Sequence, residues 1–175
     1  MTTQVHNAAL AQWNALDADA AAREILPCCG SHAWANALAE RRPFADASQL
    51  FAASDEVWAA LPEPAWREAF DSHPRIGQQH ARSATAQSLS WSSTEQRAAM
   101  SYEDTTKLAL AEANRQYEEK FGRIFIVCAS GKSAAEILAI LTTRMQNSAA
   151  DELLEAAEQQ RQITQLRLRR WLGVE

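Results

Sequence analysis

Apolar residues recur at helical spacing through the first seventy positions, and prolines divide them into short segments. Residues three or four apart lie on one face of an α-helix, so this spacing predicts helices with one buried side. The residue before a proline is displaced from helical geometry, which sets the segment ends. The predicted helices are one beginning with Leu10, Trp13 and Leu16, a short one through Ile25 that stops at Pro27, one marked by Trp34, Ala37 and Leu38 and ended by Pro43, one that Ser48 can cap and that carries Leu50, Val57 and Leu61, and a brief one over residues 66–70.

Helical periodicity is absent from residues 71–93, which are rich in Ser, Gln and Ala. Loops longer than about 12 to 15 residues in a compact domain usually have a function or are disordered. We therefore predict a long functional loop here. The helix predicted after it is the longest, runs from Ser92 to about Glu119, and carries on one side Tyr102, Ala109, Ala113 and Tyr117, with Gly122 closing it.

Residues 124–128 favour a strand locally, but the rest of the chain predicts no partner strand. We interpret them as a buried extended segment whose backbone amides need other partners, a bound substrate among them. Ser133 and Glu136 have the spacing of a capping box and begin the next helix. A last helix is predicted from about Ala149 to Leu172.

Composition favours an all-α fold class. Hydrophobic residues make up 47% of the 175 positions, many of them alanine, whereas glycine and proline number five each. This balance is typical of helical proteins rather than turn-rich sheet proteins. The length suits a single compact multi-helix domain over residues 1–175, with the long loop between helices.

The charge pattern excludes some classes of partner. The net charge of −5 includes no basic run, so nucleic acid and anionic membrane surfaces are not expected partners. The longest apolar stretch, residues 124–129, is far shorter than the roughly 20 residues of a membrane span, and the first residues lack the features of a secretory signal. We therefore expect an intracellular protein. An anionic substrate must be held by a few local cations rather than by the overall field, which makes individual arginines candidates.

Cysteine and histidine usage predicts neither a disulfide framework nor a metal site. The chain has three cysteines, of which Cys28 and Cys29 are adjacent, and an odd count without CxxC spacing suits reduced cytosolic thiols. His73 and His80 lie seven residues apart, but no clustered Cys, Asp or third histidine accompanies them. We expect no metal and no cofactor.

His73 is the first candidate for chemistry. It precedes Pro74 at the start of the predicted loop, so we expect it on an extended segment that presents the imidazole. Imidazole can give or take a proton near neutral pH. The alternative is a loop histidine bonded to backbone.

Glu95 and Arg167 each have a functional and a structural interpretation. Ser92 and Glu95 have capping-box spacing, so Glu95 either stabilises a helix start or, with Gln96, binds a ligand there. Arg167 lies between Ile163 and Trp171 on one stripe of the last helix. It either binds a carboxylate through its guanidinium fork or extends along the apolar surface into water.

Several motifs, taken together and in order, resemble the 2-oxo-4-hydroxy-4-carboxy-5-ureidoimidazoline (OHCU) decarboxylase family. Each motif is weak by itself, whereas the combination spans nearly the whole chain. The motifs are Cys29-Gly30 before Trp34, Arg42-Pro43-Phe44, Ser-His-Pro-Arg-Ile-Gly at 72–77, Ser-Ser-Thr-Glu-Gln at 92–96, Asn-Arg-Gln-Tyr-Glu-Glu-Lys-Phe-Gly at 114–122, Phe-Ile-Val-Cys-Ala at 125–129 and Leu-Arg-Leu at 166–168.

The resemblance implies a cofactor-free carbon-carbon lyase, an all-α homodimer that converts OHCU to (S)-allantoin in urate breakdown. It implies that His73, Glu95 and Arg167 are catalytic. The substrate-binding positions it implies are Pro74, Ser92, Ser93, Thr94, Gln96, Val127, Cys128, Ala129, Ser130 and Gly131. Many relatives have an arginine after the Cys-Ala pair, where this chain has Ser130-Gly131-Lys132, so the local contacts differ. Eukaryotic relatives often end in a peroxisomal tripeptide, whereas Gly173-Val174-Glu175 is no such signal, which favours a bacterial cytoplasmic protein.

These residues suggest a mechanism for decarboxylation, and two alternative functions use the same residues. Arg167 would orient the anionic substrate, Glu95 and Gln96 would bind ring and ureido nitrogens, and His73 would donate a proton to one face. The rivals are a non-catalytic helical module that binds a small anion or a partner, and a hydrolase that uses the His73 and Glu95 pair as acid and base.

Overall fold

The computed structural model describes residues 7–76, 85–97 and 104–174. Within these ranges the chain forms nine α-helices and one 3₁₀-helix (η1), and no described residue lies in a strand. The all-α prediction is confirmed. The chain divides into two compact units, unit 1 with residues 1–69 and 161–175 and unit 2 with residues 70–160. A single domain over residues 1–175 stays a prediction. No described helix is both long and apolar enough to cross a membrane.

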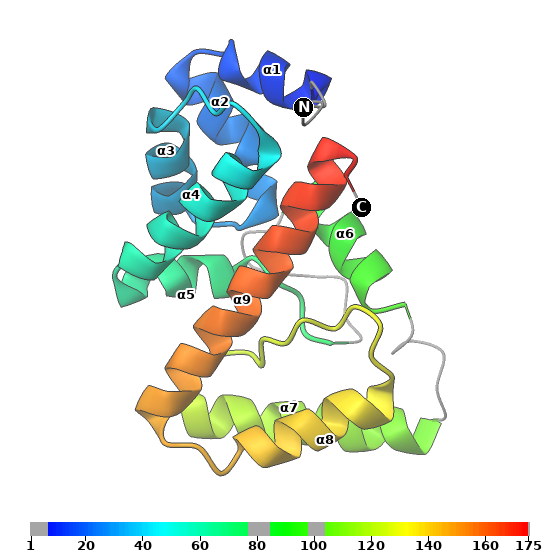
Figure 1. The fold of residues 1–175 in the computed structure, drawn as a ribbon. Helices are drawn as coiled ribbons and strands as arrows, with labels where there is room; N and C mark the ends of the chain where they lie inside the picture. Colours follow the sequence, from blue (N-terminus) through cyan, green and yellow to red (C-terminus); the bar gives the residue numbers. More distant parts are fainter. Residues whose placement is uncertain (1–6, 77–84, 98–103, 175) are drawn as a thin grey trace. The chain divides into compact units, whose positions relative to one another are not determined.

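Unit 1 is built from short capped helices around tryptophan side chains. Trp13 and Trp34 are fully buried, and the Trp13 indole donates to the carbonyl of Ala21 at 2.9 Å and stacks on Phe44. The C-terminal part of α9, drawn in red, belongs to the same unit (Figure 1). Its elements are α1 (Ala8–Asn14), α2 (Ala18–Ile25), η1 (Leu26–Cys28), α3 (His32–Glu40), α4 (Ala47–Ala60), most of α5 (Glu63–Asp71) and the C-terminal part of α9 (Ala149–Leu172).

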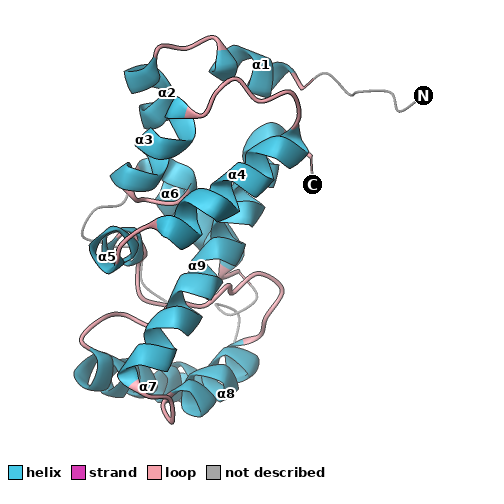
Figure 2. Ribbon diagram, turned by 60° about the vertical axis from the view of Figure 1, so that its left-hand side comes forward, coloured by secondary structure: helices cyan, strands magenta, loops and turns pink. Residues whose placement is uncertain are grey.

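Unit 2 contains α6 (Ala86–Glu95), α7 (Asp104–Phe121), α8 (Ala134–Arg144) and the N-terminal half of α9. The helices α7 and α8 lie side by side in both views (Figures 1 and 2). Their shared core contains Leu110, Tyr117, Phe121, Phe125, Val127, Ala129, Ala134, Ile137 and Leu141.

Several predicted elements are confirmed. The last helix has the expected bounds, and Ser133 and Glu136 form both hydrogen bonds of the capping box that begins α8. Gly122 follows the end of α7 with a φ of +70°, which L-residues with a Cβ rarely adopt. The segment 124–128 is mostly buried and lies outside any helix or strand.

The predicted bounds of the loop over residues 71–93 are wrong, and so is the predicted longest helix. Residues 86–95 form α6, which Thr85 caps through a capping box with Ser88. Its sequence is mostly Ser, Thr, Gln and Ala, so the helix has little apolar periodicity to detect. The helix α6 ends at Glu95 and α7 begins at Asp104, and the longest described helix is α9, with 24 residues.

Smaller predictions also need correction. Asp46, not Ser48, caps α4, because its carboxylate accepts from the amide of Gln49 at 2.9 Å. Leu16 lies beyond the end of α1 and is exposed. On α7 Ala109 is exposed, and the buried positions are Leu110, Asn114, Tyr117 and Phe121, while Tyr102 lies outside the described residues.

Candidate active site

His73 lies just after α5, where its amide donates to the carbonyl of Phe70 at 3.1 Å. The expected exposed presentation is wrong, because only 9% of the residue is exposed and Pro74 is buried as well. The His73 Nε2 lies 2.6 Å from Oε1 of Gln160, which is fully buried on α9. With the amide oxygen facing the ring, Nε2 carries the proton in the neutral imidazole.

Gln159, which precedes Gln160 on α9, binds the segment 124–128. The Gln159 side-chain oxygen accepts from the Cys128 amide at 2.9 Å, and its nitrogen donates to Glu155 at 2.9 Å. Consecutive α9 glutamines therefore contact His73 and the backbone amide of Cys128. One turn of α9 thus brings these two predicted site segments together within unit 2.

Fewer backbone amides and carbonyls of residues 127–131 are available to a substrate than the sequence predicts. Side chains already bind the Cys128 amide and carbonyl, the latter through the Lys132 ammonium at 2.8 Å. Val127, Cys128 and Ala129 are buried, whereas Ser130 and Gly131 are exposed in a turn. The turn is the part of this segment that a ligand can reach without displacing a side chain.

Glu95 lies at the last position of α6, so its predicted capping role at a helix start is wrong. The helix dipole is negative at this end and gives a carboxylate no stabilisation. Glu95 is nevertheless only 9% exposed, and Ser92 and Gln96 beside it are also buried. The same stretch places Ser93 half-buried and Thr94 exposed.

Arg167 belongs to unit 1, whereas His73 and Glu95 belong to unit 2. It is fully buried, so the interpretation that its guanidinium extends into water is wrong. Its Nη1 donates to the Pro27 carbonyl at 3.3 Å. The positive charge of the guanidinium also lowers the pKa of the neighbouring thiols of Cys28 and Cys29, although burial raises it by more.

Burial raises the pKa of both thiols, to about 12 for Cys29, although the positive charge of Arg167 opposes the shift. The thiolate is the reactive form. We predict that in a Cys128→Ser variant iodoacetamide at pH 8.5 alkylates Cys28 and Cys29 only at the rate of unfolding. Denaturant should accelerate the alkylation, which mass spectrometry measures. Rapid labelling of the native protein would contradict this assignment.

The raised pKa values of Cys28 and Cys29 also make the free energy of unfolding depend on pH. The unfolded thiols ionise near pH 9 and the folded thiols only at higher pH, so the unfolded chain binds fewer protons in between. The thiols' contribution to stability is present below pH 9 and is lost as the pH rises toward about 12.

The sequence analysis did not predict roles for Gln159 and Gln160. It also did not predict a buried ionic network of Arg144, Glu152 and Tyr117. The signal for Gln160 is a polar residue on the stripe that also carries Ala156, Ala157 and Ile163, which are buried. No three His, Cys, Asp or Glu residues cluster as metal ligands in the described ranges, and His80 lies outside them.

Comparison with known proteins gives the family. The family model of OHCU decarboxylase matches residues 14–169. The uric acid degradation bifunctional protein TTL of Arabidopsis thaliana is 37% identical over 142 residues, which cover 81% of this chain and 44% of that protein. The 2-oxo-4-hydroxy-4-carboxy-5-ureidoimidazoline decarboxylase of Amia calva is 33% identical over 148 residues, covering 83% of this chain and 80% of that enzyme.

Solved structures agree with this match. A crystal structure of OHCU decarboxylase in the presence of (S)-allantoin aligns with a TM-score of 0.75 at 32% identity, covering 86% of this chain and 97% of that chain. A crystal structure of (S)-allantoin synthase aligns with a TM-score of 0.69 at 20% identity, covering 93% of this chain and 53% of that chain, and shows the fold alone. The match over residues 14–169, with the identity to the Amia enzyme, shows that this chain belongs to the OHCU decarboxylase family.

Proposed function

We propose that this chain decarboxylates OHCU to (S)-allantoin in urate degradation. The observation that carries the proposal is His73, a buried imidazole held by Gln160, in a chain that matches the OHCU decarboxylase model over nearly its whole length. The related solved enzyme was crystallised with (S)-allantoin.

The reaction requires an electron sink and one proton. The bond to the carboxylate breaks, CO₂ leaves, and the electron pair enters the conjugated nitrogens and carbonyls of the substrate ring. A proton added to carbon then completes the product. The substrate supplies its own sink, so the proposal requires neither a metal nor an organic cofactor.

His73 is the proposed proton donor: the doubly protonated ring gives up the proton on Nδ1, while Nε2–H remains bonded to Gln160. Delivery to one face of the ring gives a single enantiomer. Glu95 and Gln96 are proposed to bind ring and ureido nitrogens, because a buried carboxylate accepts hydrogen bonds strongly. Arg167 is proposed to bind the carboxylate, since a buried guanidinium gains most from an anionic ligand. The remaining proposed contacts are Pro74, Ser92, Ser93, Thr94 and residues 127–131.

The test uses freshly generated OHCU and follows CO₂ release and the chirality of allantoin. We expect CO₂ in equal amount to allantoin and an excess of the (S) form. Because uncatalysed decay gives racemic allantoin, chirality separates enzyme from background. Consumption of substrate without CO₂ would indicate hydrolysis instead, and tight binding without turnover would indicate a binding module.

Gln160 is expected to position His73. The Gln160→Leu variant removes the acceptor for Nε2–H, so either ring nitrogen can carry the proton. We expect a roughly tenfold lower kcat, because the loss of one hydrogen bond of about 1.4 kcal/mol corresponds to that factor. A Gln160→Glu variant keeps an acceptor, favours the protonated ring and should move the pH profile of kcat/KM to higher pH. A purely structural role would lower stability and leave the profile of both variants unchanged.

We also propose a homodimer in a reducing cytoplasm. Three buried free cysteines suit that compartment. The large apolar side chains of Leu108 and Leu154 in unit 2 are 72% and 60% exposed, which suits a surface covered by a second copy. Light scattering measures the mass against 19.4 kDa for one chain.

A further inference from the structure

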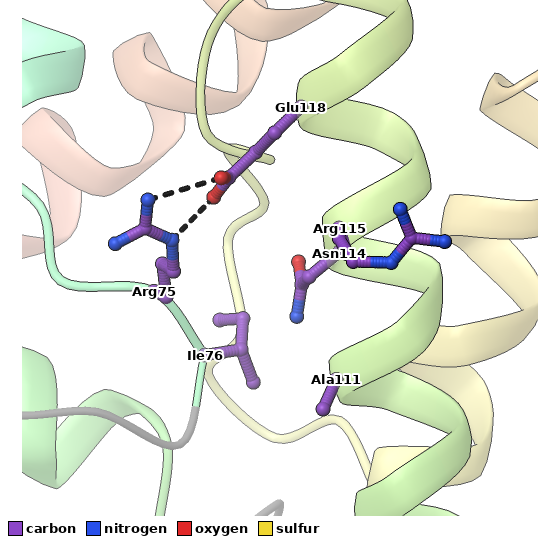
Figure 3. Close-up of a pocket in the computed structure, with 6 residues that line it drawn as sticks. All are labelled: Arg75, Ile76, Ala111, Asn114, Arg115 and Glu118. Atoms are coloured by element: carbon purple, nitrogen blue, oxygen red, sulfur yellow. Dashed lines mark hydrogen bonds and ion pairs between the residues drawn. The ribbon is translucent and has the colours of Figure 1, made fainter.

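A pocket of about 220 Å³ lies in unit 2, beside the segment that follows His73. Figure 3 shows the segment with Arg75 and Ile76 on one side and α7 on the other. The lining residues are Arg75, Ile76, Ala111, Asn114, Arg115 and Glu118. None of them is among the residues assigned above to catalysis or substrate binding.

Asn114 is the buried polar side chain that lines this pocket. It is only 6% exposed, and its carboxamide points from α7 toward Ile76 (Figure 3). No described residue forms a hydrogen bond with this carboxamide. The pocket therefore offers one acceptor and two donors to a ligand.

The charges around the pocket exclude an anion as the favoured ligand. The Arg75 guanidinium donates to both oxygens of Glu118, at 2.5 and 3.0 Å, and this hydrogen bonding raises the pKa of Arg75. Arg115 is paired with Glu112 and Glu119 and points away from Arg75 (Figure 3). Both arginines are therefore neutralised by carboxylates, and an incoming anion would have to displace one of them.

We propose that this pocket binds small neutral compounds that carry a ureido or primary amide group. Such a group presents an N–H and a carbonyl side by side, and these pair reciprocally with the Asn114 carboxamide. Ile76 and Ala111 provide apolar walls for the rest of a small ligand. Because Arg75 follows His73 by two residues, the ligand contacts the segment that carries the proposed proton donor.

The test is NMR with labelled isoleucine methyl groups and side-chain amides, using N-methylurea as the neutral probe and acetate as the anionic one. Asn114→Leu identifies the Asn114 amide signal by its loss. We expect N-methylurea to shift the Asn114 and Ile76 signals saturably, and acetate to leave them in place. In Asn114→Leu the affinity read at Ile76 should fall at least about tenfold.

Two variants sharpen the test. Gln116→Leu likewise replaces a side-chain amide by leucine, two positions on, at an exposed site that does not line the pocket, and should retain the Ile76 shift. Glu118→Gln removes the carboxylate that neutralises Arg75, so acetate should now bind. The proposal is overturned if N-methylurea causes no saturable shift, which indicates a water-filled pocket, or if acetate binds the wild type as well as N-methylurea does.

This binding proposal does not depend on turnover. Failure of decarboxylation leaves the Ile76 shift with N-methylurea unchanged, and failure of that shift leaves CO₂ release unchanged. Only the use of (S)-allantoin as a second, ureido-bearing probe rests on the proposed function. A shift at Ile76 with allantoin that Asn114→Leu abolishes would make the product a ligand of this pocket.

Discussion

The His73→Ala variant should release CO₂ from OHCU roughly 10²–10⁴-fold more slowly than wild type, the usual contribution of a positioned acid or base. Its allantoin should be racemic, because the remaining product comes from spontaneous decay and solvent protonation. The expectation follows from a buried imidazole whose Nε2 is held by Gln160 at 2.6 Å. Stopped-flow CO₂ detection and chiral analysis of the product measure both effects.

Matched variants separate the proposed roles. Glu95→Gln keeps the shape and removes the charge, and should lower kcat with His73 intact. Arg167→Lys keeps the charge and loses the bidentate fork, so KM should rise more than kcat falls. Circular dichroism and thermal unfolding confirm that each variant is folded. Wild-type rates and chirality in folded His73→Ala would refute the assignment of this residue.

The Glu152→Leu variant should lose about 3–5 kcal/mol of unfolding free energy, because it leaves the Arg144 guanidinium buried without its counter-ion. Glu152 is fully buried and accepts from Arg144 Nε at 2.8 Å, from the Tyr117 hydroxyl at 2.6 Å and from Asn147 at 2.9 Å. Burial and then the bond to Glu152 raise the pKa of Tyr117, so its hydroxyl remains the donor. Urea denaturation measures the loss.

A surface ion pair provides the control for this loss. Glu119→Leu breaks an exposed pair with Arg115 on α7 and should change stability by less than about 1 kcal/mol. The double variant Arg144→Met with Glu152→Leu should recover part of the loss, since it removes both buried charges. Equal losses of unfolding free energy in Glu152→Leu and Glu119→Leu would contradict the prediction that the buried network stabilises unit 2.

The network also explains why the extended segment stays in place. Arg144 Nη1 donates to the Ile126 carbonyl at 2.7 Å, and its guanidinium lies 4.5 Å from the centre of the Phe125 ring. Residues 124–128 form no strand, and side chains from α8 and α9 instead bind the Ile126 carbonyl and the Cys128 amide. The sequence predicts the segment but not these partners, because they lie up to 31 residues away along the chain.

Local signals determined much of the fold. The α9 bounds, the Ser133 capping box and the end of α7 at Gly122 depend on spacing within a few residues, and the structure confirms them. Local signals failed for α6. The serine- and threonine-rich α6 has no apolar stripe, and its Ser88 and Ser92 are buried by the fold around them. Spacing alone placed Glu95 at a helix start when it lies at a helix end.

The sequence by itself determined the helical class and the family, and it predicts His73, Glu95 and Arg167 as site residues, because periodicity and ordered motifs are properties of one chain read in order. Only the tertiary structure decided what surrounds them. Gln160 holds the imidazole, Arg167 is fully buried beside two thiols, and Asn114 faces a pocket without a partner among the described residues. These outcomes depend on burial and on interactions between residues distant in sequence, and no local pattern encodes either.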